Sequence, residues 1–226
     1  FSKNNHIPMI SPHNIPSQAL FNYPDLFKIQ SSRSTQSKEM ANYIKSFKHD
    51  YNILLLSDID DNKSKVYSSI FSDIYNDTSY LIMDSLNKID SILPILLKRG
   101  DDWGHLLDKL SKKKSNLIVI TSNQVPFLTY AFNQIIEFSN TQNHYRSNFE
   151  IFGFEDLYRM KTIDVLYKNK FNLHFVSKGI PNLNSQQAED FNKIYKDVFS
   201  AEPTKFSYLG YDILKSNFCK IYPQKL

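Results

Sequence analysis

The sequence lacks the features that define several simple classes of protein. Its 226 residues include one cysteine, 5 glycines and 9 prolines. Cys219 alone cannot form an internal disulfide or a multi-cysteine metal site. So few glycines and prolines, without a period, exclude collagen-like and low-complexity chains. The longest apolar runs, residues 53–56 and 117–120, are of strand length, whereas a bilayer helix needs about 20 apolar residues. We therefore expect no membrane span within this chain.

The motifs of common enzymes and metal proteins are also missing. There is no glycine-rich nucleotide loop, no Gly-Lys-Ser/Thr and no Gly-x-Ser-x-Gly. The six histidines have no i, i+4 pairing, so a zinc site is not expected. The acidic segment 58–62 lacks the glycine and the distal glutamate of a calcium-binding EF-hand loop. We predict a protein that is not an enzyme and that has no cofactor and no metal.

Charge is nearly balanced, with 27 basic and 23 acidic residues and a net charge of +4. This balance does not predict a nucleic-acid partner. The one dense basic cluster, residues 112–114 with Lys109, is interpreted as the solvated end of a helix, where cations are favoured. Hydrophobic residues make up 41% of the chain and aromatic residues 14%, which are values of a globular protein with a sizeable core.

The middle of the chain alternates strand-like and helix-like segments. Strands are predicted at 51–57, 79–83, 116–121, 149–153 and 171–177, and helices at 63–75, 127–138 and 157–166; the stretch 90–113 is predicted to be mostly helical, with breaks near Pro94 and Gly100. A parallel connection between strands needs a crossover of this length. Residues 37–177 are therefore predicted to form one α/β unit, a doubly wound parallel sheet with helices on both faces.

The two ends have a different pattern. Residues 1–36 are predicted to contain a strand at 7–11, a loop with Pro12, Pro16 and Pro24, and an extended stretch at 26–30; residues 178–226 are predicted to form helices at 185–199 and 204–218, the first capped by Ser185. These ends have too few strands for a domain of their own. They must pack together, on a missing segment, or against the central unit.

Four motifs, in the same order along the chain, resemble one known family. They are residues 10–14 (ISPHN), residues 26–44 with LFKI, Gln36 and ANYI, residues 152–155 (FGFE), and residues 194–212, which run from Ile-Tyr to Gly-Tyr-Asp. The set is similar to the type I periplasmic-binding-protein-like domains of the leucine-binding type. It looks most like cell-envelope members from Bacteroidetes-type bacteria, some of which carry peptidoglycan-binding LysM modules.

The resemblance implies two lobes that hold a ligand between them. Residues 37–177 would be an essentially complete second lobe, and residues 1–36 with 178–226 would be part of the first. The chain begins with Phe1 rather than Met, and we expect it to be a processed or N-terminally truncated piece. The lobes would close about hinges near residues 30–37 and 177–184.

Candidate binding residues follow from the predicted sheet, because ligands of such sheets lie beyond the carboxyl ends of the strands. They are Ser11, His13, Asn14, Ser57, Ser122, Asn123 and Glu155. The resemblance implies that the loop at 11–14 holds a ligand carboxylate and that Glu155 holds an ammonium group. Two simpler interpretations stay open. Glu155 and Asp156 can lie in the first turn of a helix, where their only role would be a favourable interaction with the helix dipole. Ser122 and Asn123 can cap the next helix.

Two departures from the family pattern leave the ligand open. Ile15 stands where relatives usually have a hydroxyl residue, and the segment 122–124 lacks an aromatic cover. The first hypothesis is a solute-binding module of the periplasm or cell envelope that captures a small polar, for example amino-acid-like, molecule. The second is a ligandless scaffold that contacts a cell-wall component or an envelope protein. A third is the effector domain of a transcription repressor.

Overall fold

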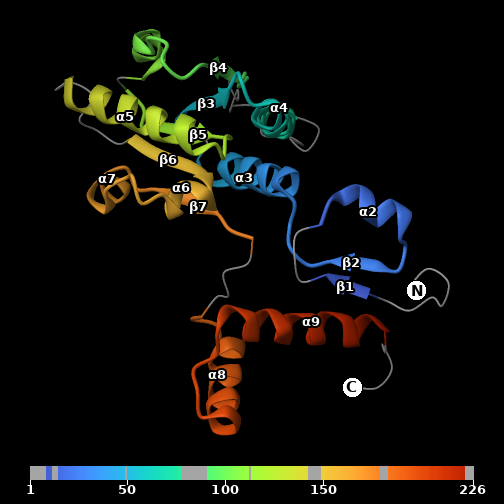
Figure 1. Cartoon of the computed structure of the whole chain (residues 1–226). Coiled ribbons are helices and arrows are strands. Elements are labelled where there is room, and N and C mark those ends of the chain that lie inside the picture. Colours follow the sequence, from blue (N-terminus) through green and yellow to red (C-terminus); the bar gives the residue numbers. More distant parts are fainter. Residues whose placement is uncertain are drawn as a thin grey trace. The chain divides into compact units, whose positions relative to one another are not determined.

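The computed structural model describes residues 9–11, 15–48, 50–77, 91–111, 113–141, 149–178 and 183–221. The chain divides into two compact units (Figure 1). We call residues 33–177 the central unit, and residues 1–32 with 178–226 the terminal unit. The central unit begins four residues before position 37, where the sequence had placed its start. The identification of the two units as lobes stays a prediction.

The described residues of the central unit form one sheet of five parallel strands. The strands are β3 (Asn52–Asp58), β4 (Ile95–Leu97), β5 (Asn116–Ile120), β6 (Phe149–Phe154) and β7 (His174–Val176), and they lie in the order β4-β3-β5-β6-β7. Every neighbouring pair is parallel. The predicted parallel α/β sheet is confirmed. The apolar runs of β3 and β5 are buried almost throughout, as expected for strands that are covered on both faces.

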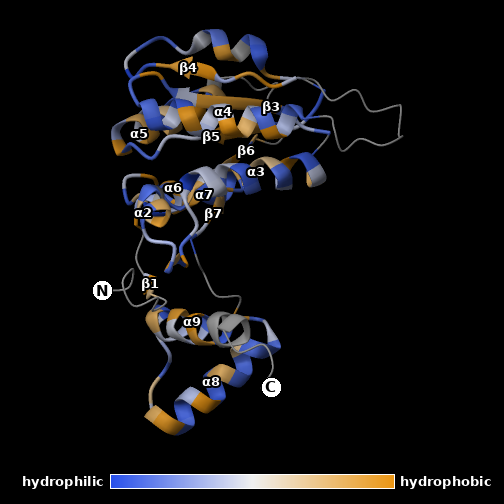
Figure 2. Ribbon diagram, turned by 90° about the vertical axis from the view of Figure 1, so that its right-hand side faces the viewer, coloured by the Kyte–Doolittle hydropathy of each residue, from blue (hydrophilic) through white to orange (hydrophobic). Residues whose placement is uncertain are grey.

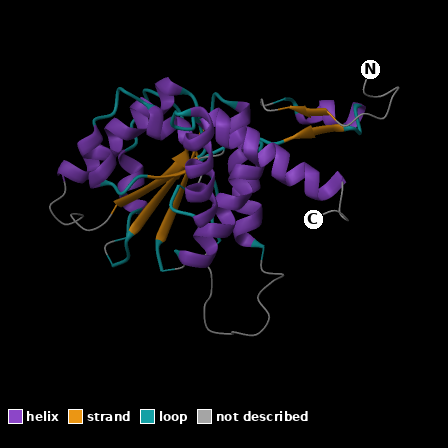
Figure 3. Cartoon of the chain, turned by 90° about the horizontal axis from the view of Figure 1, so that it is seen from below, coloured by secondary structure: helices purple, strands orange, loops and turns teal. Residues whose placement is uncertain are grey.

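Helices cover both faces of this sheet (Figure 3). They are α3 (Arg33–Phe47), α4 (Asn62–Asn76), the 3-10 helix η1 (Gly104–Lys109), α5 (Val125–Thr141), α6 (Glu155–Arg159) and α7 (Val165–Lys170). Successive residues of a strand point to opposite faces. Leu54 and Ile118 accordingly pack in a core with α5, while Leu55 and Leu117 pack in a second core with α3 and α4. The strands are the most hydrophobic part of the unit (Figure 2).

Two predicted elements of the central unit are wrong. The stretch 90–113 forms β4 and η1 rather than a broken helix. The side-chain amide of Asn76 accepts the N–H of Ile92 and donates to its carbonyl oxygen, both at 2.8 Å, which directs the chain into the sheet. The helix predicted at 157–166 is two short helices, because Asp164 accepts the N–H of Leu166 and begins a new one. The strand predicted at 79–83 lies outside the described residues.

Where the structure describes it, the terminal unit has a short parallel pair of strands and three helices. These are β1 (Met9–Ser11), α2 (Ser17–Asn22), β2 (Leu26–Lys28), α8 (Gln186–Phe199) and α9 (Lys205–Ile221). Helix α2 was predicted as a proline-containing loop, but Pro16 directly precedes its first residue, where proline is tolerated. Ser185 caps α8, as predicted, by accepting the N–H of Ala188 at 3.3 Å. Among the helices of the described residues, none has the length and apolar character needed to cross a bilayer.

Candidate functional site

The strand order locates the switch point of the sheet. From β3 the chain crosses outward to β4 and then returns past β3 to β5, so the connections of β3 and β5 run in opposite directions. In open α/β sheets, ligands bind at the carboxyl ends of the strands beside such a point. We call the segments that end β3, β5 and β6, residues 57–61, 121–124 and 154–156, the carboxyl edge. Four of the predicted residues lie there: Ser57, Ser122, Asn123 and Glu155.

Ser57 is completely buried beneath this edge. Its hydroxyl lies 3.1 Å from that of Ser64 at the start of α4. The hydroxyl of Thr121 donates to the carbonyl oxygen of Leu56 at 3.2 Å and lies 3.5 Å from Ser64. These three hydroxyls connect the ends of β3 and β5 with α4. A binding role for Ser57 stays a prediction, and its described contacts are internal.

Asp58 follows Ser57 and is only 6% exposed. Its carboxylate accepts the N–H of Asp60 at 3.0 Å, and its own N–H donates to Ser64 at 3.0 Å. Burial raises the pKa of Asp58, and the negative charges of Asp61 and Asp60 raise it further. The hydrogen bond from the N–H of Asp60 and the charge of Arg99 lower it, but the net shift is upward. Asp58 lies beside the candidate Ser57 at the end of a predicted strand and within the acidic segment 58–62, but it was not among the predicted binding residues. Its burial among other acids was not visible from the sequence.

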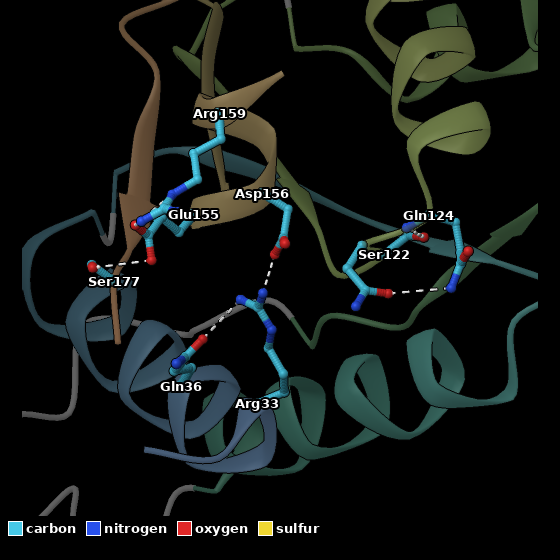
Figure 4. A network of polar contacts seen from close by, with 9 residues as sticks. Arg33, Gln36, Ser122, Gln124, Glu155, Asp156, Arg159 and Ser177 are labelled. Carbon is cyan, nitrogen blue, oxygen red and sulfur yellow. Dashed lines mark hydrogen bonds and ion pairs between the residues drawn. The ribbon is translucent and has the colours of Figure 1, made fainter. Parts of the chain in front are cut away.

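The segment after β5 forms a compact turn. Ser122 is buried, and its hydroxyl accepts the N–H of Gln124 at 3.1 Å. The side-chain amide of Gln124 donates to the side-chain oxygen of Asn123 at 3.4 Å (Figure 4). Ser122 therefore stabilises the turn that leads into α5, as in the capping interpretation. Asn123 is half-buried and Gln124 is exposed.

Glu155 and Asp156 begin α6 at the end of β6, and each carboxylate is held by an arginine (Figure 4). Arg159, one turn later, donates to one oxygen of Glu155 from Nε at 2.8 Å and also from Nη2, and Ser177 donates to the other oxygen at 3.3 Å. Asp156 forms an ion pair and hydrogen bond with Arg33. The predicted ammonium ligand Glu155 thus already has a cationic partner.

Arg33 was missed by the sequence analysis, although it lies at the centre of these contacts. Its guanidinium also donates to the side-chain oxygen of Gln36 at 2.9 Å and lies 4.6 Å from the ring centre of Phe154. The ring of Tyr67 packs edge-on against Phe154, and burial raises the pKa of its phenol. Gln36 appeared in the sequence analysis only through the family resemblance. A lone arginine at the start of a helix gave no signal.

The remaining predicted residues belong to the terminal unit. Ser11 ends β1 and pairs in register with Lys28 of β2. His13 and Asn14 lie outside the described residues, so their predicted contacts stay predictions. Within the described residues, no three histidine, cysteine, aspartate or glutamate side chains are grouped so that they could hold a metal ion.

A second polar cluster lies at the opposite, amino-terminal end of the sheet. Glu150 accepts hydrogen bonds from Lys48 and Tyr51, both at 2.8 Å, and lies 3.3 Å from Nε2 of His174. Burial alone would raise the pKa of Glu150, but these hydrogen bonds and the charge of Lys48 outweigh burial and lower it. The cluster ties α3 to β6 and β7 and has the character of a structural ion pair.

Known protein structures share the fold of this chain. No protein-family model and no curated protein sequence matches the chain. Two of the similar solved structures are an ABC transporter substrate-binding protein from Desulfitobacterium hafniense in complex with Leu (TM-score 0.56, 16% identity) and a putative branched-chain amino acid ABC transporter from Silicibacter pomeroyi (TM-score 0.57, 12% identity). Each covers 95% of this chain. The chain has the type I periplasmic-binding-protein fold. It spans 57% of the first structure and 53% of the second.

This result confirms the fold that the resemblance implied. Identities this low establish the type I binding-protein fold alone, and the assignment to Bacteroidetes-type members stays a prediction. Both neighbours are components of ABC transporters by their names, and one holds leucine.

Proposed function

We propose that the chain is part of a solute-binding module whose central unit forms one wall of the site at its carboxyl edge. The solute is a small polar molecule that carries both charges, as an amino acid does, and the module works in the periplasm or cell envelope. Three observations support this proposal: the type I binding-protein fold, the polar residues of the carboxyl edge beside the switch point, and the carboxylates and guanidinium groups at the β6 end of this edge.

The burial of the Asp58 carboxylate is the observation on which the proposal mainly rests. A carboxylate that is buried without a cationic hydrogen-bond partner favours its neutral form, which is why burial raises its pKa. A fold that needed only stability would be served as well by an uncharged residue at this position. Perturbed acids at strand ends beside a switch point are typical of functional sites. We interpret Asp58 as a solute-facing acid whose charge is stabilised when a cationic group approaches.

Calorimetry on the chain tests this proposal. We expect wild-type protein to bind at least one amino acid in a titration panel that includes leucine, and Asp58→Asn to weaken that binding at least about tenfold, a loss of about 1.4 kcal/mol. Asp108→Asn is the matched control, because Asp108 is an exposed acid on η1. The absence of any heat of binding at millimolar solute would overturn the proposal.

Although Asp58→Asn should weaken solute binding, it should increase the stability of the folded chain at neutral pH. Because burial raises the pKa of Asp58 in the folded state, the group favours folding below its unfolded pKa, near 3.8, and this contribution is lost as the pH rises through the folded pKa. We therefore expect the variant to be more stable than wild type at pH 7, by about 1 kcal/mol, and to lose this advantage below pH 4. Urea unfolding at both pH values measures the difference.

One observation favours the second candidate, a scaffold without a solute. Glu155 and Asp156 are each paired with an arginine, and the hydroxyl of Ser57 is buried in internal contacts. A scaffold of this kind would bind a cell-wall component or an envelope protein instead. Sedimentation with purified peptidoglycan separates the candidates: retention that Asp58→Asn leaves unchanged, together with silent calorimetry, favours the scaffold.

A further inference from the structure

Both connections between the two units are tied to the same place in the central unit. The chain enters this unit at Arg33 and leaves it after Ser177. Although these residues are far apart in sequence, the side chain of Arg33 binds Asp156 and that of Ser177 binds Glu155 (Figure 4). The two acids are neighbours in sequence. The first and the last residue of the unit therefore share one acidic pair at the end of β6.

The Arg33 side chain is held by more than one contact. The side chain is 11% exposed, and besides its ion pair with Asp156 it donates to Gln36 at 2.9 Å and lies over the ring of Phe154. Charge-assisted hydrogen bonds of arginine are directional, and stacking on an aromatic ring fixes the plane of the guanidinium. Gln36 lies one turn further along α3 and is itself buried. The start of α3 is thereby fixed to β6.

The Glu155 carboxylate divides its two oxygens between partners. One oxygen accepts from Arg159 in the next turn of α6, and the other accepts from Ser177 at 3.3 Å. The contact with Ser177 is weaker than the Arg33 contact, because the serine hydroxyl is a neutral donor whereas the guanidinium of Arg33 carries a positive charge. The two connections are therefore held unequally.

We propose that Glu155 and Asp156 form a hinge anchor, a pair of positioning residues that fix the first and last residues of the central unit. Through this anchor, a bound solute alters the two connections between the units. The second half of this proposal rests on the proposed function. A solute ammonium near Asp156 competes with Arg33, and a solute carboxylate near Arg33 competes with Asp156. Either event loosens the start of α3, where the chain passes between the units. This acidic pair, of which Glu155 was predicted to hold a solute ammonium group, thus also responds to the bound solute.

Hydrogen exchange of the whole chain without solute tests the anchor by itself. In Asp156→Asn we expect backbone amides 33–38 to exchange about tenfold faster than in wild type, while those of β5 are unchanged. Asp108→Asn, with the same change in charge, should leave both segments unchanged. Arg33→Lys, which keeps the charge, should lie between wild type and Asp156→Asn. If amides 33–38 of Asp156→Asn exchange at rates within twofold of those in the Asp108→Asn control, the anchor is overturned.

A double substitution keeps the result interpretable. If Arg33 and Asp156 act together, Arg33→Met with Asp156→Asn should exchange no faster at residues 33–38 than Arg33→Met alone. Additive effects would contradict a shared contact. Unchanged exchange in β5 shows that the variants are folded, so faster exchange near Arg33 is local. Ser177→Ala should accelerate exchange at residues 177–178 by a smaller factor, about threefold, because a neutral donor is lost.

Exchange with solute then tests the coupling. With leucine or another amino acid that calorimetry shows to bind, wild-type amides 33–38 should change their exchange rate at least threefold, and Asp156→Asn should show no further change. Binding with no such response would overturn the coupling and leave the anchor standing. Silent calorimetry would overturn the proposed function and with it the coupling, whereas the solute-free experiment decides the anchor in every case.

Discussion

The two units bury their apolar residues to very different extents. In the central unit, both faces of the sheet are covered, and side chains such as Phe71 and Phe132 are fully buried. In α8 of the terminal unit, only Ala188 is buried, while Ile194, Val198 and Phe199 are each more than 60% exposed. Both sequences have helix-forming apolar periodicity. The difference is that the central unit also contains the strands against which its helices pack.

This contrast shows which part of the molecule carries its own stability. Burial of a large apolar side chain contributes about 1.5–3 kcal/mol, and the central unit has two cores built from such side chains. In the terminal unit, α8 and α9 contact each other through aromatic rings, with Phe191 beside Tyr208 and Tyr211. We therefore expect substitutions in the central unit to dominate the measured stability of the chain.

The largest effect is expected from Phe132→Ala. Phe132 of α5 is fully buried and packs edge-on against Phe171, so its removal leaves a cavity that should cost about 3–5 kcal/mol of unfolding free energy. Phe199→Ala, at the exposed end of α8, is the matched substitution and should change it by less than about 0.5 kcal/mol. Urea unfolding measures both. Equal losses of unfolding free energy in the two variants would contradict the difference in burial between the units.

A pair of glycine substitutions should give smaller effects of opposite sign. A methyl group on Gly153 of β6 would lie 3.0 Å from Leu157 and 3.3 Å from the carbonyl oxygen of Ile120, so Gly153→Ala should cost about 1–3 kcal/mol. A methyl group on Gly210 of α9 meets nothing within 4 Å, and Gly210→Ala should stabilise that helix by up to about 1 kcal/mol. Thermal unfolding measures both. A stabilising Gly153→Ala would contradict tight packing in the central unit.

Glu150→Gln should cost about 1–2 kcal/mol at pH 7, less than Phe132→Ala. Because the pKa of Glu150 is lowered in the folded state, its contribution is present above its unfolded pKa of about 4.5 and is lost as the pH falls through the folded value. The pKa of its partner Lys48 is raised, since its bonds to Glu150 and Tyr51 outweigh burial, so the contribution is also lost as the pH rises through the folded pKa, above 10.5. Unfolding across pH should show a plateau between these limits. A difference that does not shrink as the pH falls below about 4.5 would contradict the ion pair.

The sequence predicted the central strands well because their signal is local. The runs at 53–56 and 117–120 are apolar on both faces, and β3 and β5 begin and end within one residue of the predictions. Strand β4 has three residues after Pro94, and it depends on pairing with residues 56–58, about 40 positions earlier. Such an edge strand carries no periodicity of its own. Helix α2 was missed for the same reason, since its six residues are short and flanked by prolines.

The candidate site was predicted only where it follows the strand ends. The positions of Ser57, Ser122 and Glu155 at the carboxyl edge follow from the parallel sheet. Their partners could not be predicted. Arg33 and Asp156 are 123 positions apart, and only the packing of α3 beside β6 brings them together. Burial of Asp58 likewise depends on surrounding elements rather than on its own segment.

The most direct test of the solute-binding account is a map of backbone amide chemical shifts during a titration with leucine and related amino acids. The account predicts that the perturbed amides gather at the carboxyl edge, around Asp58, Asn123 and Asp156. The amino-terminal ends of the same strands, around Asn52 and Glu150, should be unaffected. Perturbations centred on Glu150, or none at millimolar solute, would contradict it.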